Sequence, residues 1–292
     1  MVGAPKCGTT ALYKCLEAHP EIFVPERKEI HYFGTDLYSP TYVRDTDKYL
    51  SLFAAARNEK RLGEASVWYL YSKRASSEIK EYCPTAQIII MLRNPVDMIY
   101  SLHSQLLYSG SEDVEDFEKA LNIEAERRRG LRLPAKPYPV EGLFYQEVGK
   151  YTDQVSRYLN AFEAEKVKII IYDDFKDHPA RVCRETFDFL GVSPTFEPEI
   201  RVINPNKRDR SKGVRTFLDA PPPSLVRKLA RPLMTPEIRH KLFATLRRLN
   251  TEYLPRPPLR EELRRQLQSE FAPDVERLSH LLGRDLTSWC RT

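Results

Sequence analysis

The hydrophobic pattern of the chain alternates between short apolar runs and longer amphipathic stretches. Residues 87–92 (Gln-Ile-Ile-Ile-Met-Leu) and 167–172 (Val-Lys-Ile-Ile-Ile-Tyr) form two such runs, which are typical of parallel strands buried on both faces. Apolar residues at helical spacing predict helices over 95–108, 149–162 and 179–190. Strands that alternate with helices in this way predict an α/β fold around a central, mostly parallel sheet.

Polar and proline-rich stretches predict where the chain leaves this sheet. Residues 109–142 become polar and then proline-rich, so we interpret them as a lid or acceptor-binding insertion that carries one helix over 112–129. From about Leu259 the pattern is helical again and predicts two successive helices. We therefore expect a single domain over 1–292 that ends in a helical cap at 219–292.

The first ten residues predict a strand, a loop and the start of a helix. Val2-Gly-Ala-Pro-Lys-Cys-Gly-Thr-Thr10 precedes an amphipathic stretch that ends at Pro20. The N-terminus of such a helix directs unpaired N–H groups and a partial positive charge at the loop, which predicts a bound anion. The loop is not a Walker A motif, because Lys6 precedes Gly8 by two residues. This order disfavours ATP or GTP hydrolysis.

A second candidate site follows the apolar run at 87–92. Arg93 comes directly after the run, Asn94 is a good N-cap and Pro95 a good first helical residue. Ser101 lies two turns into the predicted helix. Arg93 is thus expected at the carboxyl end of a central strand, where open α/β sheets bind ligands.

These two motifs resemble those of sulfotransferases that use 3′-phosphoadenosine 5′-phosphosulfate (PAPS). Pro-Lys-Cys-Gly-Thr-Thr resembles the family's 5′-phosphosulfate loop, and an arginine followed eight residues later by a serine resembles its 3′-phosphate site. The resemblance implies a three-layer, P-loop-like α/β fold with helices on both sides of the sheet. It also implies a donor site made of Pro5, Lys6, Cys7, Gly8, Thr9, Thr10, Arg93 and Ser101.

The segment Lys28-Glu29-x-His31-Tyr-Phe33 resembles the one that supplies the catalytic glutamate in heparan sulfate and related carbohydrate sulfotransferases. The resemblance implies that Glu29 is the general base and that His31 orients the acceptor or supports Glu29, although either side chain could reach an acceptor hydroxyl. We expect burial and nearby negative charge to raise the pKa of Glu29 toward neutrality. The family often has an acidic residue directly after the aromatic pair; here that position is Gly34, and Asp36 comes two residues later.

Three further stretches extend the resemblance along the chain. Residues 61–71 predict a short strand and an aromatic turn, and Gly-Glu64-x-Ser-x-x-Tyr resembles the family's second strand, with Ala65 where a lysine is frequent. Glu64 is therefore a candidate for active-site contacts. Ser211-Lys212-Gly213 resembles the late loop over the 3′-phosphate and adenosine. The end of the chain, up to Trp289, resembles bacterial carbohydrate-type sulfotransferases.

The cysteines and histidines indicate the cellular compartment of the protein and whether it binds a metal. The five cysteines are odd in number and scattered, which suggests reduced thiols in a cytoplasmic protein. In the family's Golgi enzymes a disulfide commonly precedes the late loop, and here no cysteine lies between Cys183 and Cys290. The histidines lack metal-ligand spacing, and Asp173 and Asp174 are expected to cap a turn, so we expect no metal.

Charge and hydropathy exclude two further classes. The net charge of +5 is modest and the charges are interspersed, which favours an anionic ligand over nucleic acid. No apolar run approaches the ~20 residues of a membrane span, and no signal peptide is visible. Met1–Ala4 would be a short first strand against the usual ~5–6 residues, which suggests that the chain is trimmed or that its start is assigned late.

The sequence thus predicts a sulfotransferase that moves a sulfuryl group from PAPS to an acceptor hydroxyl by in-line displacement and releases 3′-phosphoadenosine 5′-phosphate (PAP). The acceptor would be a carbohydrate or glycoconjugate, otherwise a small-molecule alcohol. Lys6 would neutralise charge on the bridging oxygen, and Glu29 would take the proton. A P-loop-like kinase or NTPase and a non-catalytic binder of anionic ligands remain as alternatives. The sequence carries no signal for an oligomeric state.

Overall fold

The computed structural model describes residues 1–198, 207–210, 245–246, 249–254 and 256–291. It forms two compact units, one of Met1–Ile203 with Leu259–Thr292 and one of Asn204–Pro258. In the second unit, β5 (Lys207–Asp209) pairs with β6 (Thr251–Tyr253) in antiparallel orientation. The expected late loop Ser211-Lys212-Gly213 lies outside the described residues, as does most of the stretch before Leu259.

The two apolar runs form the centre of the sheet in the first unit. β3 (Ile88–Leu92) and β4 (Val167–Ile171) pair in parallel, from Ile88 opposite Val167 to Leu92 opposite Ile171. All five residues of β3 are buried, as a strand covered on both faces requires. The expected parallel pairing of these two runs is confirmed, and so is the burial of β3, whereas in β4 only Ile170 and Ile171 are buried.

The opening residues extend this sheet on the other side of β3. The N–H groups of Val2 and Ala4 donate to the carbonyls of Ile89 and Met91, at 3.0 and 2.7 Å, and Met91 N–H donates to Gly3 at 2.7 Å. Residues 2–4 therefore run parallel to β3. The loop that follows them emerges beside the end of β3, where Arg93 also lies.

The next stretch of sheet lies on the far side of the opening residues. β1 (Ile22–Phe23) pairs in parallel with β2 (Arg61–Leu62). Beyond β2, Ser66 N–H donates to the Met1 carbonyl at 3.1 Å and Leu70 N–H to the Val2 carbonyl at 2.7 Å. The strand and aromatic turn expected at 61–71 are thus observed, the turn being the 3-10 helix η1 (Val67–Tyr69).

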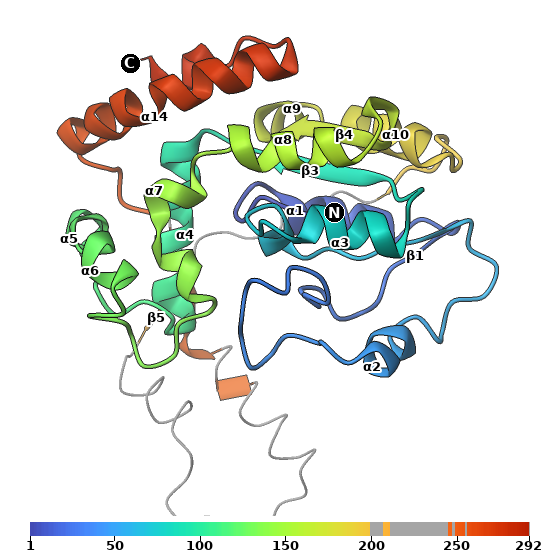
Figure 1. Cartoon of the computed structure of the whole chain (residues 1–292), viewed down its shortest axis with the longest axis horizontal. Helices are drawn as coiled ribbons and strands as arrows, with labels where there is room; N and C mark the ends of the chain where they lie inside the picture. Colours follow the sequence, from blue (N-terminus) through green and yellow to red (C-terminus); the bar gives the residue numbers. More distant parts are fainter. Residues whose placement is uncertain (199–206, 211–244, 247–248, 255, 292) are drawn as a thin grey trace, which may run out of the picture. The chain divides into compact units, whose positions relative to one another are not determined.

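Helices flank these strands (Figure 1): α1 (Thr9–Glu17), α2 (Thr46–Ser51), α3 (Ala75–Tyr82), α4 (Pro95–Ser109), α7 (Tyr145–Val148), α8 (Thr152–Ala161), α9 (Tyr172–Asp177) and α10 (Pro179–Leu190). Further 3-10 helices are η2 (Val140–Leu143), η3 (Ala164–Lys166) and, after the last helix of the chain, η4 (Thr287–Cys290). The cap predicted for α4 is present, since the Asn94 side chain accepts from Val96 N–H at 3.0 Å. α10 ends at Gly191 in the left-handed region, with φ 67°. The predicted α/β fold is confirmed.

The insertion at 109–142 is organised by a buried ion pair. Arg127, 1% exposed, donates to both carboxylate oxygens of Glu112 at 2.7 and 2.5 Å, and Tyr145 Oη donates to the same carboxylate at 2.7 Å. Glu112 also accepts the N–H groups of Asp113 and Val114, which keeps this stretch out of a helix. The single helix expected over 112–129 is therefore wrong: α5 (Phe117–Asn122) and α6 (Glu124–Arg128) replace it.

The expectation of two helices near the C-terminus is also wrong. α14 (Glu261–Leu282) continues through Pro273, although an interior proline weakens a helix by about 3 kcal/mol. The helix packs on α8 and α4, and burial of each large apolar side chain contributes about 1.5–3 kcal/mol. The free energy gained by burial thus outweighs the cost of the proline, because one row of buried apolar side chains continues along the helix on both sides of Pro273. This row consists of Leu263, Leu267, Phe271, Val275 and Leu278.

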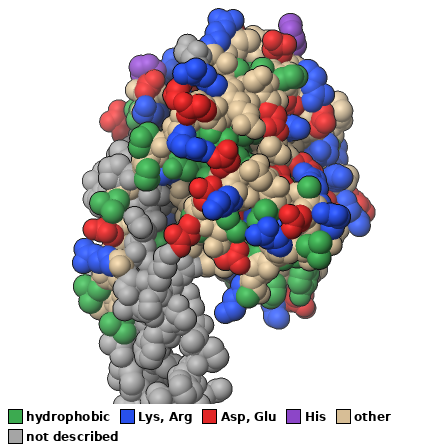
Figure 2. All heavy atoms as spheres, turned by 90° about the vertical axis from the view of Figure 1, so that its left-hand side faces the viewer, with side chains coloured by type: hydrophobic (Ala, Val, Ile, Leu, Met, Phe, Trp, Pro, Cys, Tyr) green, Lys and Arg blue, Asp and Glu red, His purple; other side chains and the backbone are tan. Residues whose placement is uncertain are grey.

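The surface shows the interspersed charges that the sequence indicates. On the face in Figure 2, basic and acidic side chains are mixed over the described part of the molecule. Among the described residues, no helix has the combination of length and apolarity that crossing a membrane requires.

Candidate active site

The expected anion loop connects the opening strand to α1. Gly8 is the N-cap of α1 in the left-handed region, with φ 86°, and no side chain caps this helix. Glycine is needed here for a second reason, because a Cβ would lie 3.0 Å from the Tyr172 ring. The first turn of α1 therefore presents its N–H groups to a ligand rather than to a side chain of its own.

Arg93 lies beside this loop. Its Nη1 donates to the Lys6 carbonyl at 3.5 Å, and its guanidinium carbon lies 4.6 Å from the centroid of the Tyr172 ring. No described carboxylate lies within ion-pair distance of Arg93. A guanidinium without a carboxylate partner is suited to bind a phosphate. Ser101, the expected partner, is buried in α4 with 4% of its surface exposed.

Lys6 and Cys7 occupy the middle of the loop. Lys6 Nζ donates to Gln105 Oε1 of α4 at 3.1 Å. The Cys7 thiol is fully buried and donates to the Pro5 carbonyl at 3.3 Å, and burial raises the pKa of this thiol to about 12. Cys7 thus stays neutral and adds no negative charge to a loop expected to bind an anion.

The candidate catalytic residues share an uncommon backbone conformation. Among the described residues, four other than glycine have positive φ: Lys6 at 60°, Glu29 at 62°, His31 at 54° and Arg132 at 51°. Such conformations cost on the order of 1–3 kcal/mol each and persist where surrounding contacts enforce them, often at functional sites. Three of the four are the residues for which a catalytic role is expected.

Contacts from the segment after β2 enforce the conformation of Glu29 and His31. Glu29 N–H donates to the Ala65 carbonyl at 2.9 Å, and Val67 N–H donates to Glu29 Oε2 at 2.9 Å. His31 N–H donates to Ser66 Oγ at 2.9 Å. The position of the candidate base is therefore set by backbone groups of a neighbouring segment.

Glu64 stabilises the segment after β2 that holds Glu29 and His31. Its carboxylate accepts from Ser66 Oγ at 2.8 Å, from Tyr69 Oη at 2.9 Å and from Tyr49 Oη at 3.3 Å. Burial raises the pKa of Glu64. These contacts make Glu64 a positioning residue for the loop that carries Glu29 and His31.

Lys28 connects the candidate base to the anion loop. Its Nζ lies 2.6 Å from Glu29 Oε1 and 3.3 Å from Thr9 Oγ1. Sequence reasoning missed Lys28, because the adjacent Lys-Glu pair is visible in the sequence whereas its contact with Thr9 is not. Tyr172, the last residue of the second apolar run, was missed for the same reason.

The charge state of Glu29 differs from the expectation. Burial alone would raise the pKa of Glu29, but the neighbouring His31 and Lys28 lower it to about 2. His31 Nε2 lies 3.1 Å from Glu29 Oε2. The expected rise toward neutrality is therefore wrong for the free protein, since the contacts with His31 and Lys28 outweigh the effect of burial on the pKa of this carboxylate.

The other acidic candidates have structural contacts. Asp36 accepts from Ser72 Oγ and from Lys73 N–H, the latter at 2.8 Å, just before α3. Asp173 and Asp174 lie in the first turn of α9 rather than in the expected turn, and Asp174 pairs with Arg284 at 2.8 Å. Among the described residues, no group of three His, Cys, Asp or Glu side chains could hold a metal.

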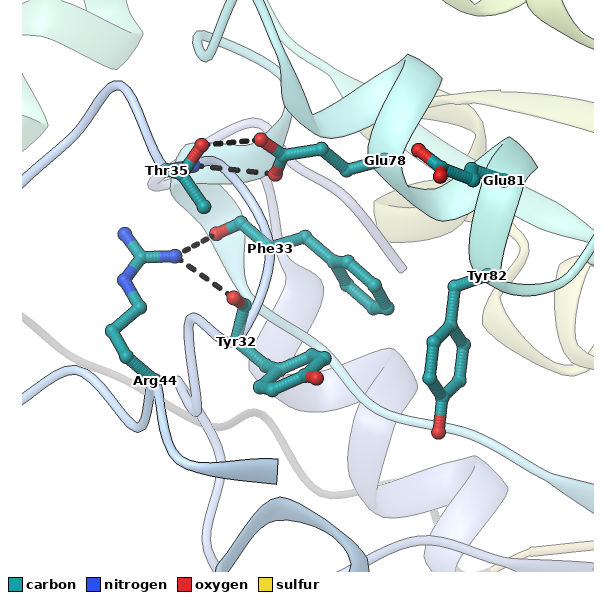
Figure 3. Close-up of a pocket in the computed structure, with 7 residues that line it drawn as sticks. All are labelled: Tyr32, Phe33, Thr35, Arg44, Glu78, Glu81 and Tyr82. Atoms are coloured by element: carbon teal, nitrogen blue, oxygen red, sulfur yellow. Dashed lines mark hydrogen bonds between the residues drawn. The ribbon is translucent and has the colours of Figure 1, made fainter. Parts of the chain in front are cut away.

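The chain beyond His31 borders a pocket of about 380 Å³ (Figure 3). Arg44 donates to the carbonyls of Tyr32 and Phe33 at 2.9 and 2.8 Å, and Glu78 accepts from Thr35 N–H at 3.2 Å. Arg44 also donates to two further carbonyls, those of Gly34 and Leu37. Hydrogen bonds from Arg44 and to Glu78 thus fix the backbone of residues 32–37, which directly follows the loop that carries Glu29.

Comparison with known proteins identifies the family. The model of the sulfotransferase domain matches residues 1–213, and the chain belongs to this family. A solved sulfotransferase from Alicyclobacillus acidocaldarius has a TM-score of 0.71 and 31% identity, covering 100% of this chain and 97% of that one. Its likeness agrees with the P-loop-like fold.

Human carbohydrate sulfotransferase 15 is 24% identical over 254 residues, covering 68% of this chain and 44% of the human protein. The human bifunctional heparan sulfate N-deacetylase/N-sulfotransferase 3 is 29% identical over 210 residues, covering 67% of this chain and 22% of that protein. This chain therefore spans less than half the length of these curated relatives.

Replacing Lys28 should reduce stability in a pH-dependent way. The pKa of Glu29 is lowered in the folded protein, so its ion pairs stabilise the fold above the unfolded value near 4.5, and this stability is lost as pH falls toward about 2. Lys28→Met should lower the free energy of unfolding by about 1–2 kcal/mol at pH 7 and by less near pH 2, where Glu29 becomes protonated in the folded protein. Urea unfolding at both pH values measures the difference.

Lys14→Met is the matched control, because Lys14 pairs with Glu17 on the exposed surface of α1. Its effect at pH 7 should be near zero. Equal losses for Lys28→Met at pH 7 and near pH 2 would contradict the assigned charge state of Glu29.

Proposed function

We propose that this protein transfers a sulfuryl group from PAPS to an acceptor hydroxyl and releases PAP. One observation carries the proposal: Lys28 joins the Glu29 carboxylate to Thr9 at the start of α1. In-line transfer requires a base on the acceptor side and anion-binding groups on the donor side of one sulfur atom. Both lie within reach of a single lysine side chain.

The donor would bind along the edge formed by the anion loop and the end of β3. The N–H groups of the first turn of α1, with the Thr9 and Thr10 hydroxyls, would hold the 5′-phosphosulfate. Arg93, with Ser101, would bind the 3′-phosphate; a role for Ser211-Lys212-Gly213 in binding the donor rests on the resemblance alone, because these residues lie outside the described part of the chain. Two features support this fit: α1 has no side-chain cap, and Arg93 has no carboxylate partner among the described residues.

The transfer step needs one proton acceptor and one electrophilic group. The acceptor oxygen forms a bond to sulfur while the bond between sulfur and the 5′-phosphate oxygen breaks, and Lys6 neutralises the charge on that leaving oxygen. The acceptor proton goes to Glu29, which the free protein keeps ionised. When the donor's negative charge attracts Lys28, Glu29 loses a cationic neighbour and becomes a stronger base.

A glycan is the acceptor class that the comparisons support best. The two human relatives are named for carbohydrate and for heparan sulfate, and a small-molecule alcohol is the second candidate. Desulfated heparan and chondroitin oligosaccharides, with p-nitrophenol as a simple alternative, are the probes for turnover. All five cysteines are free thiols, which supports a reducing, cytoplasmic setting.

PAP should stabilise the protein far more than AMP does. Charge-assisted contacts from an arginine to a phosphate contribute on the order of 1.5–3 kcal/mol, and binding to the native state alone raises Tm. A thermal-shift titration with PAP, AMP, ADP and ATP measures this and separates a sulfotransferase from a kinase. Arg93→Leu should reduce the PAP shift to that of AMP. Equal shifts with PAP and AMP in the wild-type protein would remove the 3′-phosphate site.

Lys6→Ala should abolish turnover of PAPS and weaken PAP binding only moderately. The reason is that its ammonium acts mainly on charge that develops in the transition state. Turnover is measured as PAP release in the presence of acceptor, and affinity by titration with PAP. A parallel loss of both would make Lys6 a binding residue only. A variant with unchanged turnover and affinity would exclude Lys6 from the site.

Glu29→Gln should lower kcat by ~10²–10⁴-fold with PAP binding intact, because it keeps the size of the side chain and removes its basicity. His31→Asn should lower kcat less, as expected for a residue that orients the acceptor. The pair is compared at pH 7 by PAP release from PAPS. An inactive His31→Asn variant beside an active Glu29→Gln variant would reverse the roles and make His31 the base.

A further inference from the structure

Nε2 of His31 and the hydroxyl of Tyr42 are both buried beside Glu29: Nε2 faces Glu29 Oε2 at 3.1 Å, whereas the Tyr42 hydroxyl has no hydrogen-bond partner among the described residues. The His31 side chain is 1% exposed, and its ring centroid lies 4.3 Å from that of Tyr42, with 32° between the ring planes. Buried polar groups without partners are few in native proteins. An unpartnered hydroxyl on a ring that packs against His31, next to the candidate base, indicates a place where a polar ligand group completes the bonding.

A third ring lies against these two. Tyr138 comes from the insertion at 109–142, and its centroid lies 5.6 Å from that of Tyr42 and 6.3 Å from that of His31, edge-on to both. Burial, and to a smaller extent the charge of Glu29, raise the pKa of both tyrosines. Both hydroxyls therefore stay protonated. The effect of Glu29 on both pKa values shows that the two hydroxyls lie within electrostatic range of its carboxylate.

We propose that the Tyr42 hydroxyl and the His31 imidazole bind the hydroxyl-bearing ring of the acceptor at Glu29, and that Tyr138 covers this position until the acceptor arrives. The proposal rests on the proposed function and names the residues that receive its acceptor. The ligand class is a ring that carries a hydroxyl, either a pyranose or a phenol. Aromatic rings offer such a ligand a face to pack on, and the two polar atoms bind its oxygen.

Tyr42→Phe tests the hydroxyl, because it removes only the oxygen that lacks a partner. Loss of an unsatisfied buried group should leave the Tm of the free protein unchanged or raise it by about 1–4 °C. The KM for the acceptor should rise about 3- to 10-fold, with the KM for PAPS unchanged. Desulfated heparan oligosaccharide and p-nitrophenol are the two probes, and the one whose KM responds identifies the ring.

Tyr71→Phe is the matched control, because the Tyr71 hydroxyl donates to Glu147 at 2.8 Å. It should lower Tm and leave the acceptor KM unchanged. A fall in Tm for Tyr42→Phe as large as for Tyr71→Phe would overturn the proposal without any acceptor, since it would show a bonded hydroxyl. An unchanged acceptor KM would overturn it as well. Absence of PAPS turnover in the wild-type protein with every acceptor would instead contradict the proposed function.

Tyr138→Ala tests the covering role. Removing this ring should let water reach Glu29 and the donor, so hydrolysis of PAPS to PAP and sulfate without acceptor should increase several-fold over the wild-type protein. The affinity for PAP should stay the same. A rate of hydrolysis equal to that of the wild-type protein would overturn the covering role of Tyr138.

Discussion

The candidate active site depends on how the Glu29 carboxylate is held. The residue has a left-handed backbone, at φ 62°, which the neighbouring segment enforces through Ala65 and Val67. Lys28 and His31 then keep the carboxylate ionised. Strain in the backbone and enclosure of a charge are both unfavourable, and both are offset by contacts made outside the reacting groups. The arrangement is stable only as long as the segment after β2 stays against the sheet.

This constraint explains why residues remote in sequence support one loop. Glu64 accepts hydrogen bonds from three hydroxyl groups, and Arg44 donates to four carbonyls of the chain that follows His31. On the donor side, Tyr172 packs against both Gly8 and Arg93. Each of these side chains acts through packing or hydrogen bonds on a group expected to touch substrate. A preorganised site of this kind is what transfer by positioning and electrostatics requires.

Much of the fold was predictable from the sequence because its signals are local. The apolar runs at β3 and β4, the Asn94 cap and the glycine after α10 each depend on a few adjacent residues. The predictions that were wrong depend on contacts between residues that are distant in the sequence. α14 passes through Pro273 because the burial of apolar side chains before and after the proline outweighs the broken hydrogen bond. Asp174 lies in a helix, and the residue that pairs with it, Arg284, is 110 residues away in the sequence.

The same division applies to the site. The anion loop, Arg93 and the Lys-Glu-x-His segment could be named from motifs, and their assignment to a donor and a base remains a prediction. The contact of Lys28 with Thr9, and the low pKa of Glu29 that partly follows from Lys28, could not be foreseen. They arise where α1 and the segment after β1 meet in space. The rings of Tyr42 and Tyr138 likewise come together from two stretches that carry no recognisable motif.

A crystal structure of the PAP complex tests the central claim most directly, because it reports where both phosphates bind. The account predicts that the 5′-phosphate accepts from the first-turn N–H groups of α1 and that the 3′-phosphate pairs with Arg93. It also predicts that Lys28 turns from Glu29 toward the nucleotide. PAP bound elsewhere, or bound here without contact between Arg93 and the 3′-phosphate, would contradict the account.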